Sequence, residues 1–315
     1  MNISKLKVPI LQAPIEATAR LAAAVSNSGG MGSMGLAWTG PDAAAKLVDE
    51  MLRMTPHPFF VNFVLAFEPR AFDAVIEAGV PAITLSWGLA PDLIKRAHRR
   101  DVSIGVQIGS VYGAKAAIAD GADFVICQGV EAGGHVQSTT GLSILLPQVL
   151  DIAKDVPVVA AGGLADERDV GRVLDQGATA AMLGTRFVAT EESEAHPLYK
   201  NAIVAAEGSD TVYTTCFDGG WPSAPHRVIR NQLFDSWESA GCPQRRNRPG
   251  EGQLLAIHPS GQKIRKYDFN EPVLDIPLDD VSDWCLYAGL GCNKIFDVPS
   301  VTELMRRLWS NHEFH

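Results

Sequence analysis

The chain has 315 residues, of which 46% are hydrophobic and 20% are charged, and its formal net charge at pH 7 is -9. This length can form one large α/β domain with an appendage, or two domains. The acidic balance argues against nucleic acid as a partner, and no apolar run reaches the roughly 18 residues that a membrane span requires.

The start of the chain and its cysteines add two expectations. The first residues lead directly into an apolar run, without the apolar core of a signal peptide, so we expect a cytoplasmic protein. The five cysteines include no C-x-x-C pair, and neither a disulfide framework nor a zinc site is predicted. The histidines are scattered along the chain, so we expect no metal cluster.

Apolar runs that are typical of strands alternate with helical segments over the first two thirds of the chain. Helical spacing is clear at 91–100, where Leu93, Ile94 and Ala97 share one face. We expect eight strands, at residues 9–12, 33–37, 59–64, 82–86, 103–108, 123–128, 157–161 and 179–183. Eight β-then-α units favour an α/β fold of the (β/α)8 or TIM-barrel type over the competing open, doubly wound sheet.

A weak internal repeat supports the barrel. At Gly79, Gly121 and Gly177 a helical segment ends and a buried strand begins within a few residues. Glycine readily adopts the left-handed backbone conformation that ends many helices. The repeat therefore indicates successive β-α units.

The stretch at 123–135 is the strongest candidate for chemistry. The apolar residues 124–127 are typical of a strand buried on both faces of a parallel sheet, and the strand ends at Gln128. Gly133 and Gly134 would let the backbone approach a flat ligand, and His135 suits proton transfer near neutral pH. A loop histidine is more often a solvated or capping residue than a catalyst, so residue type alone leaves both interpretations open.

Two later turns indicate a phosphate site. Gly162 and Gly163 follow the seventh expected strand, and residues 182–185 follow the eighth. These are the loops with which TIM barrels commonly bind phosphate. Any barrel needs glycine in tight turns, so the glycines alone do not indicate a ligand. The position of these turns after the seventh and eighth strands favours a phosphorylated cofactor. The G-x-G-x-x-G at 30–35 is set aside, because it follows a helix and leads into a strand.

With these motifs in view, the chain resembles the nitronate monooxygenase family, formerly called 2-nitropropane dioxygenases. The family's fold is an FMN-binding TIM barrel with a smaller added segment. The resemblance covers residues 9–186, and its most specific element is Gln128-Gly-x-Glu-Ala-Gly-Gly-His135. Supporting matches are Gln12-Ala13-Pro14, Gly30-Met31-Gly32, Asn62, Ala161-Gly162-Gly163 and Gly184-Thr185-Arg186-Phe187.

The resemblance implies roles for individual residues. Asn62 and Gln128 would hydrogen-bond the flavin, and Gly133 would let its loop lie against it. Residues implied to bind the phosphate are Gly163, Met182, Leu183, Gly184 and Thr185. The other residues expected in the FMN site are Gln12, Ala13, Pro14, Met31, Gly32, Gln107, Gly134 and Gly162.

His135 matches the family's catalytic base. The resemblance implies that it takes the α-proton from a neutral nitroalkane or, when protonated, holds an anionic nitronate. Oxygen would complete the conversion to a carbonyl compound and nitrite, with the flavin carrying the redox chemistry. The implied partners are a small nitro compound and O2, without nucleic acid or membrane, and assembly into a homo-oligomer is left open.

Two further functions stay open. An FMN-dependent enoyl-(acyl-carrier-protein) reductase resembles the chain over the same barrel, shares the Glu-Ala-Gly-Gly-His loop and would use NAD(P)H. A non-catalytic flavin-binding protein is the third hypothesis. The chain also departs from many family members near its C-terminal end. Those members have Tyr/Ala-Gly-Gln there, whereas residues 287–291 of this chain read Tyr-Ala-Gly-Leu-Gly. A polar contact to substrate or flavin is therefore expected to be absent.

The last third of the chain is expected to be less regular. We expect the FMN-binding barrel over 1–206, a lid or mouth-covering extension over 207–278, and a C-terminal segment over 279–315 with helices at 279–286 and 301–309. Residues 242–277 are predicted to form a long loop or small lid. Trp221 is expected to pack over the barrel mouth, and Arg227 and Arg230 to have structural roles rather than to bind an anion.

Overall fold

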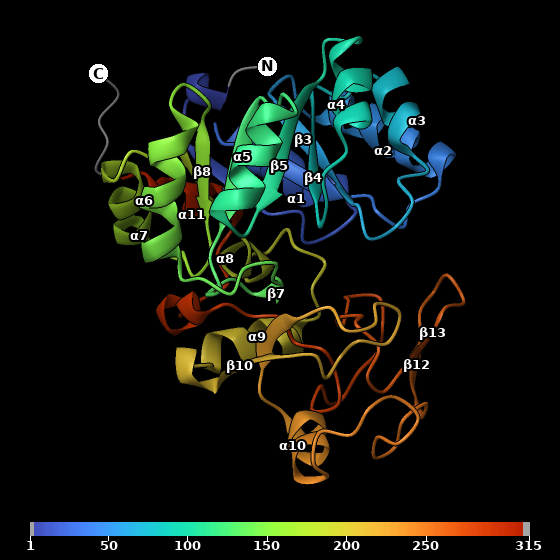
Figure 1. Ribbon diagram of the computed structural model, residues 1–315. Helices are drawn as coiled ribbons and strands as arrows, with labels where there is room; N and C mark the ends of the chain where they lie inside the picture. The colour runs from blue at the N-terminus through green and yellow to red at the C-terminus, as the bar shows by residue number, and fades with distance from the viewer. Residues whose placement is uncertain (1–2, 311–315) are drawn as a thin grey trace.

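Eight parallel strands form the central sheet, in the order β1-β9-β8-β6-β5-β4-β3-β2 (Figure 1). The computed structural model describes residues 3–310, so residues 1–2 and 311–315 of the predicted segments lie outside the described part. A parallel bridge between Leu11 and Met31 joins the end strands β1 and β2, so the sheet curls into a barrel. The strands are β1 (Ile10–Gln12), β2 (Gly32–Gly35), β3 (Phe59–Val64), β4 (Ala82–Ser86), β5 (Ser103–Ile108), β6 (Phe124–Gln128), β8 (Val158–Ala161) and β9 (Ala180–Leu183). The predicted TIM barrel is confirmed.

Helices connect these strands and begin where the local sequence favours a helix start. Pro41 and Pro91 occupy the first turns of α2 and α4. The Ser110 side chain accepts a hydrogen bond from the Gly113 N–H at the start of α5. The helices are α1 (Ala19–Asn27), α2 (Pro41–Met54), α3 (Phe72–Glu77), α4 (Pro91–His98), α5 (Val111–Ala119), α6 (Leu142–Ala153), α7 (Glu167–Asp175) and α8 (Thr185–Val188). Within residues 3–310, no helix combines the length and apolarity needed to cross a bilayer.

The glycines of the internal repeat lie where the sequence predicts. Gly79, Gly121 and Gly177 have φ values of 88°, 94° and 105° just after α3, α5 and α7. Other residues rarely adopt this left-handed conformation, so glycine ends each helix and turns the chain into the next strand.

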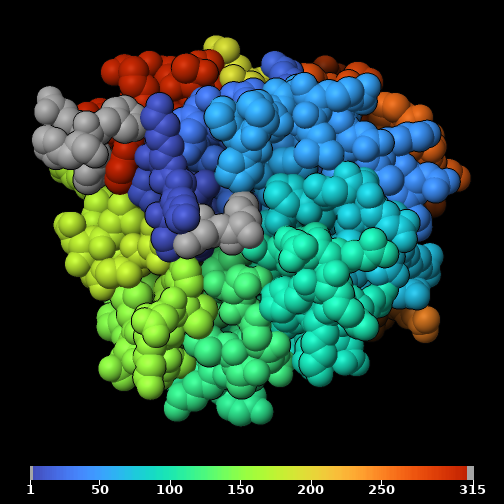
Figure 2. Space-filling view, turned by 90° about the horizontal axis from the view of Figure 1, so that it is seen from above, coloured from blue at the N-terminus to red at the C-terminus, as the bar shows by residue number. Residues whose placement is uncertain are grey.

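A late helix joins the outer layer of helices, and apolar side chains fill the barrel. In Figure 2 the chain colours run in order around this face of the molecule, from blue through cyan to green. The helix α11 (Val301–Leu308) packs against α1 and α7. The helix predicted at 301–309 is therefore confirmed. Phe60, Phe124 and Met182 meet inside the barrel, while a second apolar layer lies between the strands and the helices.

Residues 189–300 form an extension on one side of the barrel, drawn below it in Figure 1. It meets the loops at the C-terminal ends of the barrel strands: β7 (Gly134–His135), in the loop after β6, pairs with β11. The resulting sheet has the order β10-β11-β7. The extension contains α9 (Pro197–Ala205), β10 (Thr211–Thr214), β11 (His226–Ile229), α10 (Gln232–Ser239), β12 (Leu254–Ile257), β13 (Lys263–Arg265) and the 3-10 helix η3 (Leu290–Lys294).

Two expectations for this part of the chain need correction. The helix predicted at 279–286 is wrong, because this segment uses its polar groups in turns and in pairing with β11. The Asp280 carboxylate accepts the Ser282 N–H (3.1 Å), and the Leu286 carbonyl accepts the Ile229 N–H (2.8 Å). The predicted loop at 242–277 contains the β12-β13 hairpin.

Candidate active site

A cavity of about 580 Å³ lies where the strand-end loops of the barrel meet the extension. In a TIM barrel this is the end that carries the chemistry. Most residues singled out from the sequence line this cavity: Ala13, Pro14, Asn62, Gln107, Gln128, Gly133, Gly134, His135, Gly162, Gly163, Met182, Gly184 and Thr185. Residues that are far apart in the chain therefore form one site.

Four residues predicted for the FMN site lie elsewhere. The Gln12 side chain accepts the Ser33 N–H (2.7 Å) and so joins β1 to β2. Met31 is buried inside the barrel, and Leu183 is buried in the layer between strands and helices. Gly32 is explained by packing, since a Cβ there would lie 1.9 Å from the Ala22 carbonyl oxygen of α1. These residues shape the barrel beneath the cavity.

Three side-chain amides extend from strand ends into the cavity. Asn62 Nδ2 donates to the Thr84 hydroxyl (2.9 Å), which fixes the amide between β3 and β4. Gln107 Nε2 donates to Gln137 Oε1 (2.9 Å). Gln128 Nε2 donates to the His135 carbonyl (3.2 Å), and its Oε1 accepts the Gln137 N–H (2.9 Å). Such oriented amides can both donate to and accept from a heteroaromatic ligand.

His135 lies on β7 and belongs to the lining of the cavity. Its Nε2 atom is buried and has no hydrogen-bond partner in the described part of the chain. Burial, and to a smaller extent the nearby His226, lower the pKa of His135 to about 3. The imidazole is therefore uncharged near neutral pH, which is the form a proton acceptor must have.

His226 is a site residue that the sequence analysis missed. It pairs with His135 in the β11-β7 register, and the two rings lie 5.5 Å apart. Its Nδ1 lies 2.9 Å from the Ala224 carbonyl, and its Nε2 accepts the Phe217 N–H (3.2 Å), an arrangement that fits a neutral ring. Burial lowers the pKa of His226 to about 4. The sequence holds only a weak signal, the β-branched pair Val228 and Ile229 that follows it.

The glycines around His135 serve different purposes. A Cβ at Gly133 would lie 2.5 Å from the Gly289 backbone nitrogen, so this glycine allows the loop to pack against residues 288–289. Gly134 has φ +74° and no heavy atom within 4 Å of its Cβ position, so the space beside it is open. Gly162 and Gly163 have φ values of 118° and 68°, which a tight turn after β8 requires.

Aromatic rings cover the other side of His135. The Trp221 ring stacks on the imidazole with a centroid distance of 4.1 Å and an interplanar angle of 25°. Trp87 and Phe67 approach Trp221 edge-on at 4.8 and 5.2 Å. Phe269 lies 5.2 Å from Trp38. The predicted packing of Trp221 over the barrel mouth is confirmed, whereas Phe67 and Phe269 were not foreseen.

A third side of the cavity is acidic. Glu16, Glu194 and Glu271 line it, and the described lining contains no lysine or arginine. The Glu16 carboxylate accepts the Thr18 hydroxyl (2.8 Å) and the Glu194 N–H (3.0 Å). Burial raises the pKa of Glu16 from its ordinary value and that of Glu271 to about 7. None of these acids was singled out from the sequence, because each lies in an irregular segment.

Arg227 and Arg230 have the structural roles that the sequence favoured. The Arg227 guanidinium donates to the Val130 carbonyl (3.0 Å) and the Thr211 hydroxyl (3.3 Å), which ties the loop before β7 to the extension. Arg230 pairs with Asp235 (2.7 Å) and Glu238 (2.5 Å) on α10. Neither guanidinium lines the cavity.

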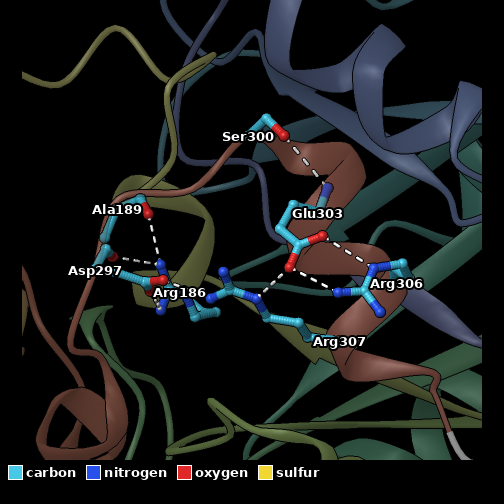
Figure 3. A network of polar contacts seen from close by, with 7 residues as sticks. All are labelled: Arg186, Ala189, Asp297, Ser300, Glu303, Arg306 and Arg307. Atoms are coloured by element: carbon cyan, nitrogen blue, oxygen red, sulfur yellow. Dashed lines mark hydrogen bonds and ion pairs between the residues drawn. The ribbon is translucent and has the colours of Figure 1, made fainter.

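Arg186 stabilises the turn after β9 through hydrogen bonds made outside the cavity (Figure 3). It is buried and donates to the carbonyls of Ala189 and Asp297, each at 2.7 Å. Arg307 on α11 contacts the Asp297 carboxylate and also donates to Glu303 (2.7 Å). This network joins the Gly184-Thr185 turn to the C-terminal helix. Arg186 therefore supports the site without entering the cavity.

In the described range 3–310, no group of three or more histidine, cysteine or acidic side chains is placed to hold a metal ion. The reactive features of the cavity are accordingly its imidazole, its amides, its glycine turns and its acids. A buried proton acceptor beside a cavity at the end of a TIM barrel can remove a proton from a small molecule held there.

Comparison with known protein families gives one match over most of the chain. The family model described as "Nitronate monooxygenase" matches residues 1–74 and 69–311. A "Probable nitronate monooxygenase" from Bacillus subtilis is 32% identical, and the match covers 98% of this chain and 97% of that protein. For another curated relative, a putative monooxygenase of Mycobacterium tuberculosis, the match covers only 43% of the relative's length.

Solved structures give the same fold. A FabK structure from Thermotoga maritima superposes with a TM-score of 0.80 at 28% identity, covering 98% of this chain and 93% of that chain. A structure described as nitroalkane oxidase from Streptomyces ansochromogenes gives a TM-score of 0.76 at 26% identity, covering 97% and 95% of the two chains. Both likenesses include the barrel and the extension.

Proposed function

The chain belongs to the nitronate monooxygenase family of oxidoreductases, and from this premise we propose that it uses FMN and O2 to convert nitroalkanes or nitronates into carbonyl compounds and nitrite. The observation that carries the proposal is the His135 imidazole, which belongs to the lining of the cavity and whose buried Nε2 has no hydrogen-bond partner in the described residues. Family membership supplies the reaction type, and this side chain supplies the proton acceptor that the reaction needs.

The cavity suits a flat, phosphorylated cofactor. Asn62, Gln107 and Gln128 would hold the polar edges of the isoalloxazine ring, beside the open space at Gly134. The backbone N–H groups of the turns at 162–163 and 184–185 would hold the phosphate. When bound, FMN supplies the redox chemistry that no side chain of the site can provide.

His135 removes the proton from a neutral nitroalkane. The α C–H bond breaks, its proton moves to the imidazole, and its electron pair stays on the carbon and nitro group. Because the substrate becomes negative as the ring becomes positive, each charge stabilises the other inside the buried site. Trp221 stacks on the ring and keeps water from it, so the ring is neutral before substrate enters.

The proposal is tested with purified, FMN-loaded protein, nitroethane and ethyl nitronate. We expect oxygen uptake and nitrite release from at least one of the two forms, and acetaldehyde as the carbonyl product. A yellow protein that releases no nitrite from either form, over several nitroalkane chain lengths, would refute the proposed reaction. Treating the protein with an inert alkyl carboxamide in place of substrate gives the background rate.

An enoyl reductase is the second candidate function, and the likeness to FabK over 98% of the chain fits it. This activity needs NAD(P)H, whereas the proposed oxidation does not. Rapid anaerobic bleaching of the flavin by NADPH, together with turnover of an enoyl thioester, would favour the reductase.

A further inference from the structure

Four of the residues that line the cavity are tryptophan or phenylalanine, and we call them the aromatic wall. Trp38 follows β2 and Trp87 follows β4, whereas Trp221 and Phe269 belong to the extension. Two of the rings therefore come from the barrel and two from the extension. The aromatic wall forms only when these two parts of the chain pack together, and the local sequence around each ring gives no sign of it.

The rings of the aromatic wall pack on one another. Between ring centroids, Trp38 lies 5.2 Å from Phe269 and 6.4 Å from Trp221, and Trp87 lies 4.8 Å from Trp221. Phe67, which does not line the cavity, packs edge-on against Trp38 at 5.3 Å and against Trp221 at 5.2 Å. Tilted and edge-on pairs are the favourable arrangements for aromatic side chains, so the rings hold each other in place.

The aromatic wall lies next to the proposed base. The ring centroid of His135 is 4.1 Å from that of Trp221, 6.0 Å from that of Phe269 and 6.3 Å from that of Trp87. A substrate can give its α-proton to His135 only if its nitro-bearing carbon comes within reach of this ring. The groups attached to that carbon then lie beside the wall. The wall is therefore placed to contact the carbon chain of the substrate.

The backbone of Trp87 is strained. Its φ is +62°, in the left-handed region that glycine favours, although Trp87 carries one of the bulkiest side chains. Such strain persists only where the surrounding structure holds it, and it concentrates at sites that bind ligands. The residue before it is Ser86, whose hydroxyl donates to the Asn62 side-chain oxygen (3.5 Å). The strained turn therefore places the Trp87 ring in the cavity, close to an amide that we propose to hold the cofactor.

Trp38 is open to solvent at the same wall. Its side chain is 56% exposed, although it lines the cavity and packs against Phe269 and Trp221. A large apolar ring left open at a cavity is typical of a place where an apolar part of a ligand binds. A flat ring on the ligand would remove this surface from water and add another aromatic contact. The two-carbon chain of nitroethane is too short to cover it.

We propose that the substrate of this chain is a nitro compound that carries a flat apolar ring, such as a phenyl group, and that the aromatic wall binds this ring. The inference rests on the proposed function and adds the substrate class. It makes Trp38, Trp87 and Phe269 specificity-determining residues, while His135 remains the base. The reaction itself is unchanged, so the carbonyl product is an aldehyde or ketone that carries the same ring.

The test compares nitroethane, 1-nitro-2-phenylethane and 1-nitro-2-cyclohexylethane with the FMN-loaded enzyme, each as the neutral compound and as its nitronate, with like forms compared. A methylene separates each ring from the nitro-bearing carbon, so the α-protons have similar acidity. From nitrite release, we expect kcat/KM for the phenyl compound to exceed that for nitroethane by roughly 10- to 100-fold, the effect of burying one phenyl group. Equal values would overturn the inference. A cyclohexyl value at or above the phenyl value would overturn the preference for a flat ring.

Two variants locate the ring site. Trp38→Leu keeps an apolar side chain without a ring, and Trp87→Gly introduces the residue that best tolerates a φ of +62°. In each variant we expect the ratio of kcat/KM for the phenyl compound to that for nitroethane to fall roughly two- to tenfold, the effect of one aromatic contact. Tyr112→Leu is the matched control, because it removes an exposed ring on α5 that does not line the cavity. The ratio should not change in this control. A wild-type ratio in both cavity variants would contradict the assigned site.

Binding without turnover separates this inference from the proposed function. Propionamide and 3-phenylpropionamide have the shapes of nitroethane and 1-nitro-2-phenylethane but cannot react, and their Kd values follow from the change in flavin absorbance. We expect the phenyl amide to bind at least roughly tenfold more tightly. This result without nitrite release from any nitro compound would support the ring site and overturn the proposed function. Nitrite release with equal Kd values would do the reverse. Loss of FMN from both cavity variants, with the amide preference unchanged, would assign the wall to the cofactor and overturn the inference.

Discussion

The barrel and the extension contribute different chemistry to the same cavity. The barrel supplies short polar side chains and glycines at strand ends, such as Asn62, Gln128 and Gly134. The extension supplies large rings and an acid, namely Trp221, Phe269 and Glu271. His135 joins the two parts, because β7 belongs to a barrel loop but pairs with β11 of the extension. Barrel residues are therefore suited to hold a cofactor, and extension residues to choose what reaches it.

The difference suggests how such an enzyme changes its substrate. A TIM barrel positions strand-end groups through its backbone, so its cofactor-facing side chains are fixed by the fold. The side chains of the extension lie in turns and irregular segments, where replacements disturb fewer neighbours. Substitutions in the extension are expected to alter selectivity, while substitutions at the barrel end are expected to alter cofactor binding or the chemical step.

The largest effect is expected at the residue where the two parts meet. His135→Asn removes the proton acceptor but keeps a polar side chain of similar size. We expect kcat/KM for nitroethane to fall roughly 10²-fold or more, the usual loss for a general base. FMN content, measured by absorbance after denaturation, should stay at the wild-type level. Unchanged turnover would remove His135 from the mechanism, and loss of FMN would give it a cofactor-binding role instead.

The next prediction concerns how the extension is held together. Arg248 and Asp218 form a buried ion pair at 2.8 Å, and Arg248 also donates to the Cys216 carbonyl (3.1 Å). Arg248→Met leaves the Asp218 charge buried without its partner, so we expect unfolding to become easier by about 3 kcal/mol. Urea titration followed by tryptophan fluorescence measures this change.

A second variant separates charge from packing in the same prediction. Replacing both residues, with Arg248→Met and Asp218→Asn, removes the uncompensated charge as well as the pair. We expect the double variant to recover most of the lost stability. Equal losses in the single and double variants would show that Arg248 contributes through packing on Tyr267, whose ring lies 5.2 Å away.

A smaller effect is expected from the ring that covers His135. Trp221→Ala admits water to the imidazole, so the pKa of His135 should rise from about 3 toward its ordinary value of about 6.5. The base must be neutral to act, so kcat/KM for nitroethane is lost as pH falls through the pKa of the free enzyme. The acid limb of the pH profile should therefore move to higher pH in the variant. Trp38→Ala, which removes a ring that does not stack on His135, should leave the acid limb in place.

The barrel could be predicted from the sequence because its signals are local. Buried parallel strands are continuous apolar runs, and the strands at 59–64, 82–86 and 103–108 match the structure at both ends. The other five strands begin and end within two residues of their predicted bounds. The motif at 128–135 and the glycine turns could likewise be placed at the barrel end, because strand ends of a barrel meet there.

The extension could not be predicted in the same way. The strand β11 pairs with β10 and with β7, and β7 lies some ninety residues earlier in the chain. The segment at 279–286 carries an apolar pattern that fits a helix, but its backbone is used by β11 and by turns. Glu271 and Phe269 have no local signal at all. Their role depends on a cavity that forms only when the extension closes over the barrel.

One measurement tests the central claim most directly: anaerobic mixing of the FMN-loaded protein with nitroethane alone, and separately with NADPH, while the flavin absorbance is followed. We predict that nitroethane alone reduces the flavin absorbance, that oxygen restores it, and that nitrite appears in the same mixture. The His135→Asn protein should show the same change at least roughly 10²-fold more slowly. Bleaching by NADPH with no response to nitroethane or its nitronate would contradict the account and make the protein a reductase.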